Sequence, residues 1–95
     1  MKTYKITQTN EFKKDLKQCI KRGKNLKKLY AVLDMLSHNI TLPPKYKDHK
    51  LTGYESNRNV RDCHIEPDWV LIYEKIDDKL ILCLLQIGTH SDLFR

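Results

Sequence analysis

Two apolar runs near the carboxyl end of the chain constrain the fold more than any other feature. Residues 69–76 and 80–85 are rich in β-branched, aromatic and leucine side chains and are typical of strands. Residues 77–78, both aspartate, separate the runs at the length of a hairpin turn. A third run, residues 59–64, precedes a turn at residues 66–67. Because antiparallel strands joined by short turns are neighbours, the sequence predicts three adjacent antiparallel strands.

Polar residues at the ends of these strands are predicted to meet at one edge of the sheet. This edge would carry His64, Asp68, Gln86 and, just beyond the last strand, His90. Pairing across the two turns places Trp69 opposite Gln86 and His64 opposite Trp69, so that these three residues share a face. The opposite face would hold Cys63, Ile65, Val70, Ile72, Ile81, Cys83, Leu85 and Ile87. Since both faces are apolar, we expect helices to cover one and a partner to cover the other.

The first half of the chain predicts a strand and a helical hairpin. Residues 2–7 alternate between apolar and polar side chains, as a short strand does. Thr9 or Asn10 can cap a helix, Gly23 can end it, and Asn25 can cap a second helix. The apolar stripe of the first helix would be Phe12, Leu16, Cys19 and Ile20, and that of the second Leu26, Leu29, Tyr30, Val32, Leu33 and Leu36. The short link implies that the two helices pack together on the sheet.

The element order β-α-α-β-β-β describes an α+β fold in which a helical hairpin packs on an antiparallel sheet. Residues 1–95 suffice for a single domain with a modest core. No apolar run is long enough to span a membrane, and no hydrophobic signal region begins the chain, so we expect a cytoplasmic protein. The three cysteines lack CxxC spacing and are expected to be buried free thiols.

Positive charge is concentrated in the first half of the chain. The formal net charge is +6, and residues 1–50 hold 13 of the 18 Lys/Arg but four of the 12 Asp/Glu. This imbalance favours a polyanion or an acidic partner, with a solvated lysine surface as the alternative. In the irregular stretch 41–59, Lys45, Lys47 and Lys50 are interleaved with tyrosines. Lysines contact phosphates and aromatic rings stack on bases, so the stretch suits a nucleic acid, although an ordinary solvated loop would look similar.

The histidines predict acid–base chemistry. Cleaving RNA without a metal requires a base for the 2′-OH proton, an acid for the leaving 5′-oxygen and positive charge for the transition state. His49, His64, His90 and Asp68 could transfer or direct protons. Positive charge could come from Arg61, Lys45, Lys47, Lys50 and Arg95. A zinc site is the competing use of such residues, but their irregular spacing and basic surroundings favour a site without metal or cofactor.

Three blocks carry a family resemblance. Asp48-His49-Lys50-Leu51-Thr52-Gly53, the stretch 61–73 containing CHIEPDW, and the GTHSDLF block at 88–94 resemble the YafQ branch of the RelE/ParE toxins. The LPPKYK segment at residues 42–47, directly before the first block, also fits the pattern of this family. The resemblance therefore covers essentially the whole chain. It implies a RelE/ParE-like fold and the toxin of a bacterial type II toxin–antitoxin pair. Such a toxin would be a metal-independent, ribosome-dependent mRNA endoribonuclease that uses the RNA's own 2′-OH as nucleophile.

The resemblance also assigns roles to matching positions. It implies a catalytic set of His49, His64, Asp68, His90 and Phe94, with His64 and His90 as acid and base in an order left open. His49 and Asp68 would orient the substrate or tune the histidines, and Phe94 would position a base. The implied partners are mRNA on the ribosome, an acidic, DinJ-like antitoxin and, through the antitoxin complex, operator DNA.

One position departs from the family pattern. The family usually has Arg two residues before the glycine of the last block, where this chain has Gln86. A glutamine can donate a hydrogen bond to RNA but carries no charge, and the loss of one stabilising group can cost about 10²–10³ in rate. Arg61 or a loop lysine could compensate. The alternative is a weak or non-catalytic member acting through its antitoxin complex and operator DNA. Gyrase poisoning, the ParE-type activity, is disfavoured because that branch lacks this histidine set.

Overall fold

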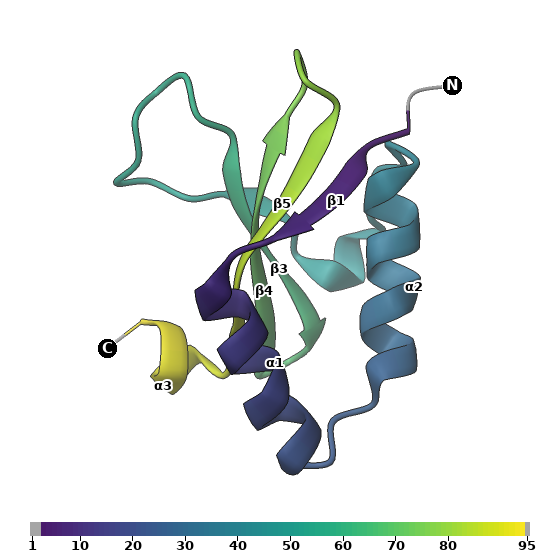
Figure 1. Ribbon diagram of the computed structural model, residues 1–95, viewed down its shortest axis with the longest axis vertical. Helices are drawn as coiled ribbons and strands as arrows, with labels where there is room; N and C mark the ends of the chain where they lie inside the picture. Colours follow the sequence, from purple (N-terminus) through teal and green to yellow (C-terminus); the bar gives the residue numbers. More distant parts are fainter. Residues whose placement is uncertain (1–2, 95) are drawn as a thin grey trace.

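The computed structural model describes residues 3–94 and confirms the α+β class: a five-stranded sheet carries two long helices (Figure 1). The sheet order is β1-β5-β4-β3-β2. The elements are β1 (Lys5–Gln8), α1 (Asn10–Lys21), α2 (Leu26–Ser37), the 3₁₀ turn η1 (Pro44–Tyr46), β2 (His49–Lys50), β3 (Val60–Glu66), β4 (Trp69–Ile76), β5 (Ile81–Gly88) and α3 (His90–Leu93). Among the described helices, none is long and apolar enough to cross a membrane.

The predicted helix signals act where the sequence places them. The Thr9 hydroxyl accepts a hydrogen bond from Phe12 N at 3.0 Å, and Asn25 Oδ1 accepts one from Lys27 N at 3.0 Å. Gly23 follows α1 with φ at +79°, a conformation that glycine adopts without strain. Two residues of the predicted apolar stripes are nevertheless exposed: Ile20 is 51% exposed and Tyr30 57% exposed.

The sheet is mixed, because β1 runs parallel to β5, with Lys5 opposite Ile81 and Gln8 opposite Leu84. The other strand pairs are antiparallel, as predicted. Strand β2 and helix α3 were not predicted, and η1 begins at a proline in a stretch expected to be irregular. The predicted first strand reaches back to position 2, which lies outside the described residues.

The predicted strand register is wrong, and its failure moves His64 to the other face of the sheet. Trp69 pairs with Glu66 on β3, His64 pairs with Val70, and Gln86 pairs with Ile72. A bulge interrupts the β3–β4 pairing and another interrupts β4–β5, and each shifts the register by one residue. Since side chains alternate between faces, these shifts reverse the predicted grouping of His64 with Trp69.

One face of the sheet forms the core against α1 and α2. The buried cluster on this side includes Phe12 and Cys19 of α1, Leu29, Val32 and Leu36 of α2, and Cys63, Ile65, Trp69, Leu71, Tyr73, Leu82, Leu84 and Ile87 of the sheet. The opposite face carries Val60, Val70 and Ile72, which are buried within the single chain. These three residues therefore do not depend on a partner for their burial, and the covering of this face by a partner stays a prediction.

The cysteines match their expected state only in part. Cys19 and Cys63 are buried free thiols, and Cys83 is free but half-buried. The indole N–H of Trp69 donates to Cys19 Sγ at 3.3 Å, which satisfies that polar group inside the core. Burial raises the pKa of the Cys63 thiol, so this cysteine remains neutral.

Candidate active site

His64, Asp68, His90 and Phe94 meet where β3 and β5 end and β4 begins. His64 lies near the end of β3, Asp68 lies in the following turn, and His90 and Phe94 belong to α3 and its C-terminal cap. The ring centroids of His64 and His90 are 5.1 Å apart, and those of His90 and Phe94 are 6.0 Å apart. The predicted meeting of His64, Asp68 and His90 at one edge is therefore present, although the register behind the prediction is not. Phe94, which the resemblance added to the catalytic set, joins them.

The backbone fixes which ring nitrogen each histidine offers. His64 Nδ1 lies 3.2 Å from the carbonyl oxygen of Pro67, and His49 Nδ1 lies 2.8 Å from that of Lys47. A carbonyl oxygen only accepts, so Nδ1 carries the proton in both rings. In the neutral imidazole, Nε2 is then the nitrogen that can take up a proton.

Asp68 holds His90 in the same way and by two contacts. Its Oδ1 accepts from the backbone N–H of His90 at 3.0 Å and lies 2.8 Å from His90 Nδ1. These hydrogen bonds lower the pKa of Asp68 below its ordinary value, so this carboxylate is ionised at neutral pH. Both groups are substantially exposed, and His90 can present Nε2 to a substrate.

Asp62 is a site residue that the sequence analysis missed. It precedes His64 by two positions on β3 and therefore shares its face of the sheet, yet it is only 4% exposed. Its Oδ1 lies 3.1 Å from His49 Nδ1 but has no aligned hydrogen bond within residues 3–94, because the N–H of His49 is directed at Lys47. Burial raises the pKa of Asp62, and the nearby His49, His64 and His90 oppose that rise. The alternation along residues 60–64 was the available signal.

Helix α3 is fixed by contacts on both sides. Thr89 and Asp92 form a capping box, and Arg22 at the end of α1 donates to Asp92 Oδ2 at 2.7 Å. The guanidinium and the cap together lower the pKa of Asp92 to about 2. Gly88 is required here, because a Cβ at that position would lie 2.9 Å from Asp92 Oδ2. These contacts set the position of His90 and Phe94.

Gln86 is directed to α1. It pairs with Ile72 on β4, in the same row as Asp62, and its amide N–H donates to Glu11 Oε1 at 2.8 Å. The predicted row that joined Gln86 to His64 is therefore wrong, although the pairings place both residues on the same face of the sheet. The partner of Gln86 is a carboxylate from the first turn of α1.

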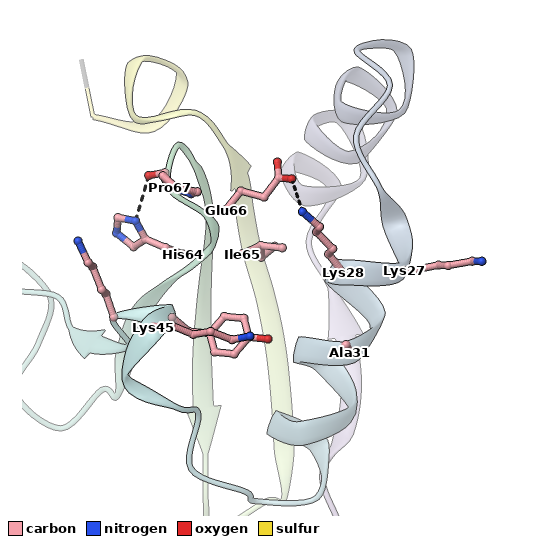
Figure 2. Close-up of a pocket in the computed structure, with 10 residues that line it drawn as sticks. Lys27, Lys28, Ala31, Lys45, His64, Ile65, Glu66 and Pro67 are labelled. Atoms are coloured by element: carbon pink, nitrogen blue, oxygen red, sulfur yellow. Dashed lines mark hydrogen bonds and ion pairs between the residues drawn. The ribbon is translucent and has the colours of Figure 1, made fainter.

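The predicted RNA-binding cations divide between two regions. Lys45 and Lys47 line a pocket that also contains His64 (Figure 2), and Lys50 is exposed on β2. Arg61 lies on the helix side of the sheet, with its Nε 3.1 Å from Asp48 Oδ1, so the structure does not bring it to the histidines. Arg95, another predicted source of charge, lies outside the described residues.

The part of the chain that the structure describes contains no evident metal-binding site. No group of three or more His, Cys, Asp or Glu side chains there is arranged to hold a metal ion. The carboxylates near the histidines instead accept from, or face, Nδ1 of His90 and His49.

Comparisons with known proteins agree on one family. The family model described as the bacterial toxin of type II toxin–antitoxin systems, YafQ, matches residues 4–95. The mRNA interferase toxin YafQ of Escherichia coli K12 is 44% identical over 90 residues, which is 94% of each chain. The chain also resembles YafQ in the crystal structure of the E. coli DinJ–YafQ complex, with a TM-score of 0.87, 38% identity and coverage of 98% and 99% of the two chains. A metal-bound toxin from Helicobacter pylori is similar as well, with a TM-score of 0.88, 41% identity and coverage of 96% and 99%. The chain belongs to the YafQ family of bacterial type II toxins.

Proposed function

We propose that the protein is an mRNA endoribonuclease that cleaves ribosome-bound RNA by metal-independent acid–base catalysis. The observation that carries the proposal is the pair His64 and His90, with ring centroids 5.1 Å apart and Nδ1 of each held by an acceptor. Two imidazoles so placed can present Nε2 to the same phosphodiester. The relatives named mRNA interferases support the choice of substrate.

Each step of the proposed reaction uses a group already at the site. One histidine, in its neutral form, takes the proton of the RNA 2′-OH as the 2′-oxygen attacks phosphorus. The P–O5′ bond breaks, and the other histidine, in its protonated form, gives a proton to the leaving 5′-oxygen. The products are a 2′,3′-cyclic phosphate and a 5′-OH. Asp68 keeps His90 in the productive orientation, and Phe94 at 6.0 Å from His90 can pack against a base.

Charge around the phosphate would come from a protonated histidine and from lysines. His49, held 3.1 Å from Asp62, stands on the same face as His64, and Lys45 and Lys47 line the adjoining pocket. These cations can stabilise the dianionic transition state that Gln86 cannot neutralise.

Mapping new mRNA 5′ ends after induction in a host without antitoxin tests the proposal directly. We expect cuts in phase with codons, and we expect His90→Ala to lower their frequency by about 10²–10⁴-fold, since a general acid or base contributes that much. His38→Ala, on the exposed C-cap of α2, is the matched control and should cut as the wild type does. Cutting that is equal in the His90→Ala and wild-type chains would exclude this site.

Metal independence can be examined separately. A chelator selective for zinc and copper leaves the magnesium that ribosomes require, and we expect cleavage to continue unchanged in its presence. A loss of cleavage that zinc or copper restores would instead favour metal-assisted chemistry, for which the metal-bound H. pylori toxin is a precedent of binding.

A weak or non-catalytic toxin is the second candidate, favoured by the contact between Gln86 and Glu11. An arginine at position 86 would meet the same carboxylate, so Gln86→Arg should be compared with Gln86→Arg combined with Glu11→Gln. A large gain in cleavage in the double variant would mean that the native site lacks a cation. No gain would mean that the other cations suffice.

The proposed partners follow from the same family membership. Relatives crystallised as DinJ–YafQ complexes make an acidic, DinJ-like antitoxin the expected inhibitor of this basic chain. Operator DNA would be bound through that complex, and the ribosome and its mRNA would be met in the cytoplasm. Gyrase poisoning predicts DNA breaks during growth arrest, and we expect none.

A further inference from the structure

A pocket of about 610 Å³ opens beside His64, between the end of β3, the helix α2 and the turn η1 (Figure 2). Its volume falls in the range of about 300–1,000 Å³ that small-ligand sites occupy. Figure 2 shows Ala31 of α2 on one side and His64 and Ile65 of β3 on the other. The floor is apolar, while the ring of Tyr46 and the cations of η1 complete the wall.

The pocket is cationic at its rim. Four lysines line it, and its one lining carboxylate, Glu66, is neutralised by Lys28 at 2.9 Å and by Lys24 at 3.2 Å. In Figure 2, Lys28 points to Glu66 and Lys27 points away from the pocket. Apart from Lys27, the lining cations without a carboxylate partner among the lining residues are Lys45 and Lys47 of the η1 segment. An occupant of this pocket should therefore combine a flat apolar group with negative charge.

We propose that the pocket binds the base of a nucleotide adjacent to the cleaved phosphodiester, with Lys45 and Lys47 contacting its phosphate. This inference rests on the proposed ribonuclease function and adds to it a second subsite, outside the histidine cluster. His64 belongs both to the lining and to the catalytic pair, so a base in the pocket is one nucleotide away from the phosphate at His64. Apolar contact for a base and lysines for its phosphate are what RNA-binding sites provide.

An acidic antitoxin peptide would also meet lysines here, but the continuity with His64 favours RNA. An extended peptide needs backbone hydrogen-bond partners along its length, and a helical peptide needs only an apolar groove, so neither would use the reactive histidine in this lining, whereas an RNA phosphodiester would. The antitoxin is accordingly an alternative that the experiment must separate.

Filling the pocket tests the proposal without touching charge or chemistry. Ala31 is exposed on α2 and lines the pocket, so Ala31→Phe places a ring in the space reserved for the base. Tyr30→Ala is the control, because Tyr30 is the adjacent exposed residue of α2 and lies outside the pocket lining. Binding should be measured with an RNA made non-cleavable by 2′-O-methylation, alone and on the ribosome. We expect Ala31→Phe to weaken binding about 5–100-fold, the effect of losing one stacked base, and Tyr30→Ala to leave it unchanged.

An abasic RNA makes the test specific to a base. RNAs that lack the base on either side of the cleavage position, one at a time, should bind the wild-type chain less tightly at one of the two positions. For that RNA, Ala31→Phe should cause no further loss, because the pocket then has no base to exclude. Equal additional losses with the intact and the abasic RNA would overturn the proposal.

The remaining outcomes separate this proposal from the function on which it rests. If Ala31→Phe binds and cleaves RNA as Tyr30→Ala does, while the wild-type chain still requires His90, the ribonuclease function stands and the pocket assignment falls. If Ala31→Phe weakens only the binding of an antitoxin, the pocket belongs to that partner and the proposal is overturned. If the wild-type chain cuts no RNA, the proposed function and this subsite fall together.

Discussion

On the helix-covered face of the sheet, Leu71, Leu82 and Tyr73 are buried against α1 and α2. On the opposite face, the neighbouring strand β3 carries His64 within reach of solvent and Asp62, which is buried and whose Oδ1 has no aligned partner within residues 3–94. The first face gains stability from apolar burial, while the second keeps polar groups where a substrate can reach them. The comparison shows that one sheet separates stability from function by side-chain alternation, together with the bulge that decides which face His64 occupies.

The helix-covered face should dominate stability. Leu71 is fully buried on β4, and Leu71→Ala should lower the free energy of unfolding by about 2–5 kcal/mol through the cavity that it leaves. Denaturant unfolding followed by circular dichroism measures this loss. We expect the fraction that remains folded to cleave RNA at the wild-type rate. A lower rate per folded molecule would mean that the two faces are coupled.

The histidine-bearing face should dominate activity instead. Asp68→Asn lets an amide donate to His90 Nδ1 and so favours the tautomer that protonates Nε2, which should lower the cleavage rate by about 10²–10⁴-fold. The pH–rate profile of the variant is the measurement, together with its melting temperature, which should hardly change. Asp78→Asn in the exposed turn before β5 is the matched control. Equal rates for the two variants would remove Asp68 from the mechanism.

Replacing Asp62 should change stability and cleavage activity in opposite directions. Its raised pKa means that the ionised carboxylate destabilises the folded chain at neutral pH, so Asp62→Asn should raise stability by about 1 kcal/mol, or about 4–8 °C in melting temperature. Cleavage should fall, because His49 loses the negative charge at 3.1 Å. As pH falls towards the raised pKa of Asp62, the carboxylate becomes protonated and no longer destabilises the wild-type chain. The difference in free energy of unfolding between the wild type and Asp62→Asn should therefore narrow. A variant that is both less stable and fully active would contradict this account.

Local signals explain how much of this arrangement the sequence could predict. Thr9, Gly23 and Asn25 act through neighbours a few residues away, and residues 69–76 are a strand in both prediction and structure. The register was wrong because a bulge at each of two pairings changes it by one residue, and Leu80, in the turn with φ at +51°, belongs to the turn and not to the strand. No local sequence pattern predicted these bulges or the left-handed conformation of Leu80.

The candidate site was predictable where chain order suffices and not where packing decides. His64, Asp68 and His90 had to approach one another once the three strands were neighbours, whatever their register. The contact of Gln86 with Glu11 joins residues 75 positions apart and depends on where α1 meets the edge of β5. Whether Asp62 is buried depends on which face each strand presents, and therefore on the same bulges.

The smallest expected effect comes from the ion pair between Arg22 of the helix layer and Asp92 of α3. Arg22, on the helix layer, holds Asp92 of α3 at 2.7 Å, and both side chains are substantially exposed, so Arg22→Ala should lower the melting temperature only slightly. Because Asp92 has a folded pKa of about 2, below its ordinary 3.8, the pair contributes stability above that ordinary value and loses it as pH falls from about 4 to 2. Cleavage should fall several-fold, since α3 carries His90 and Phe94, and added salt should reduce wild-type activity towards that of the variant. Lys21→Ala, one residue earlier, is the control. If both variants cleave alike at every pH and salt concentration, the capping box of Thr89 alone positions α3, and the two faces act without this link.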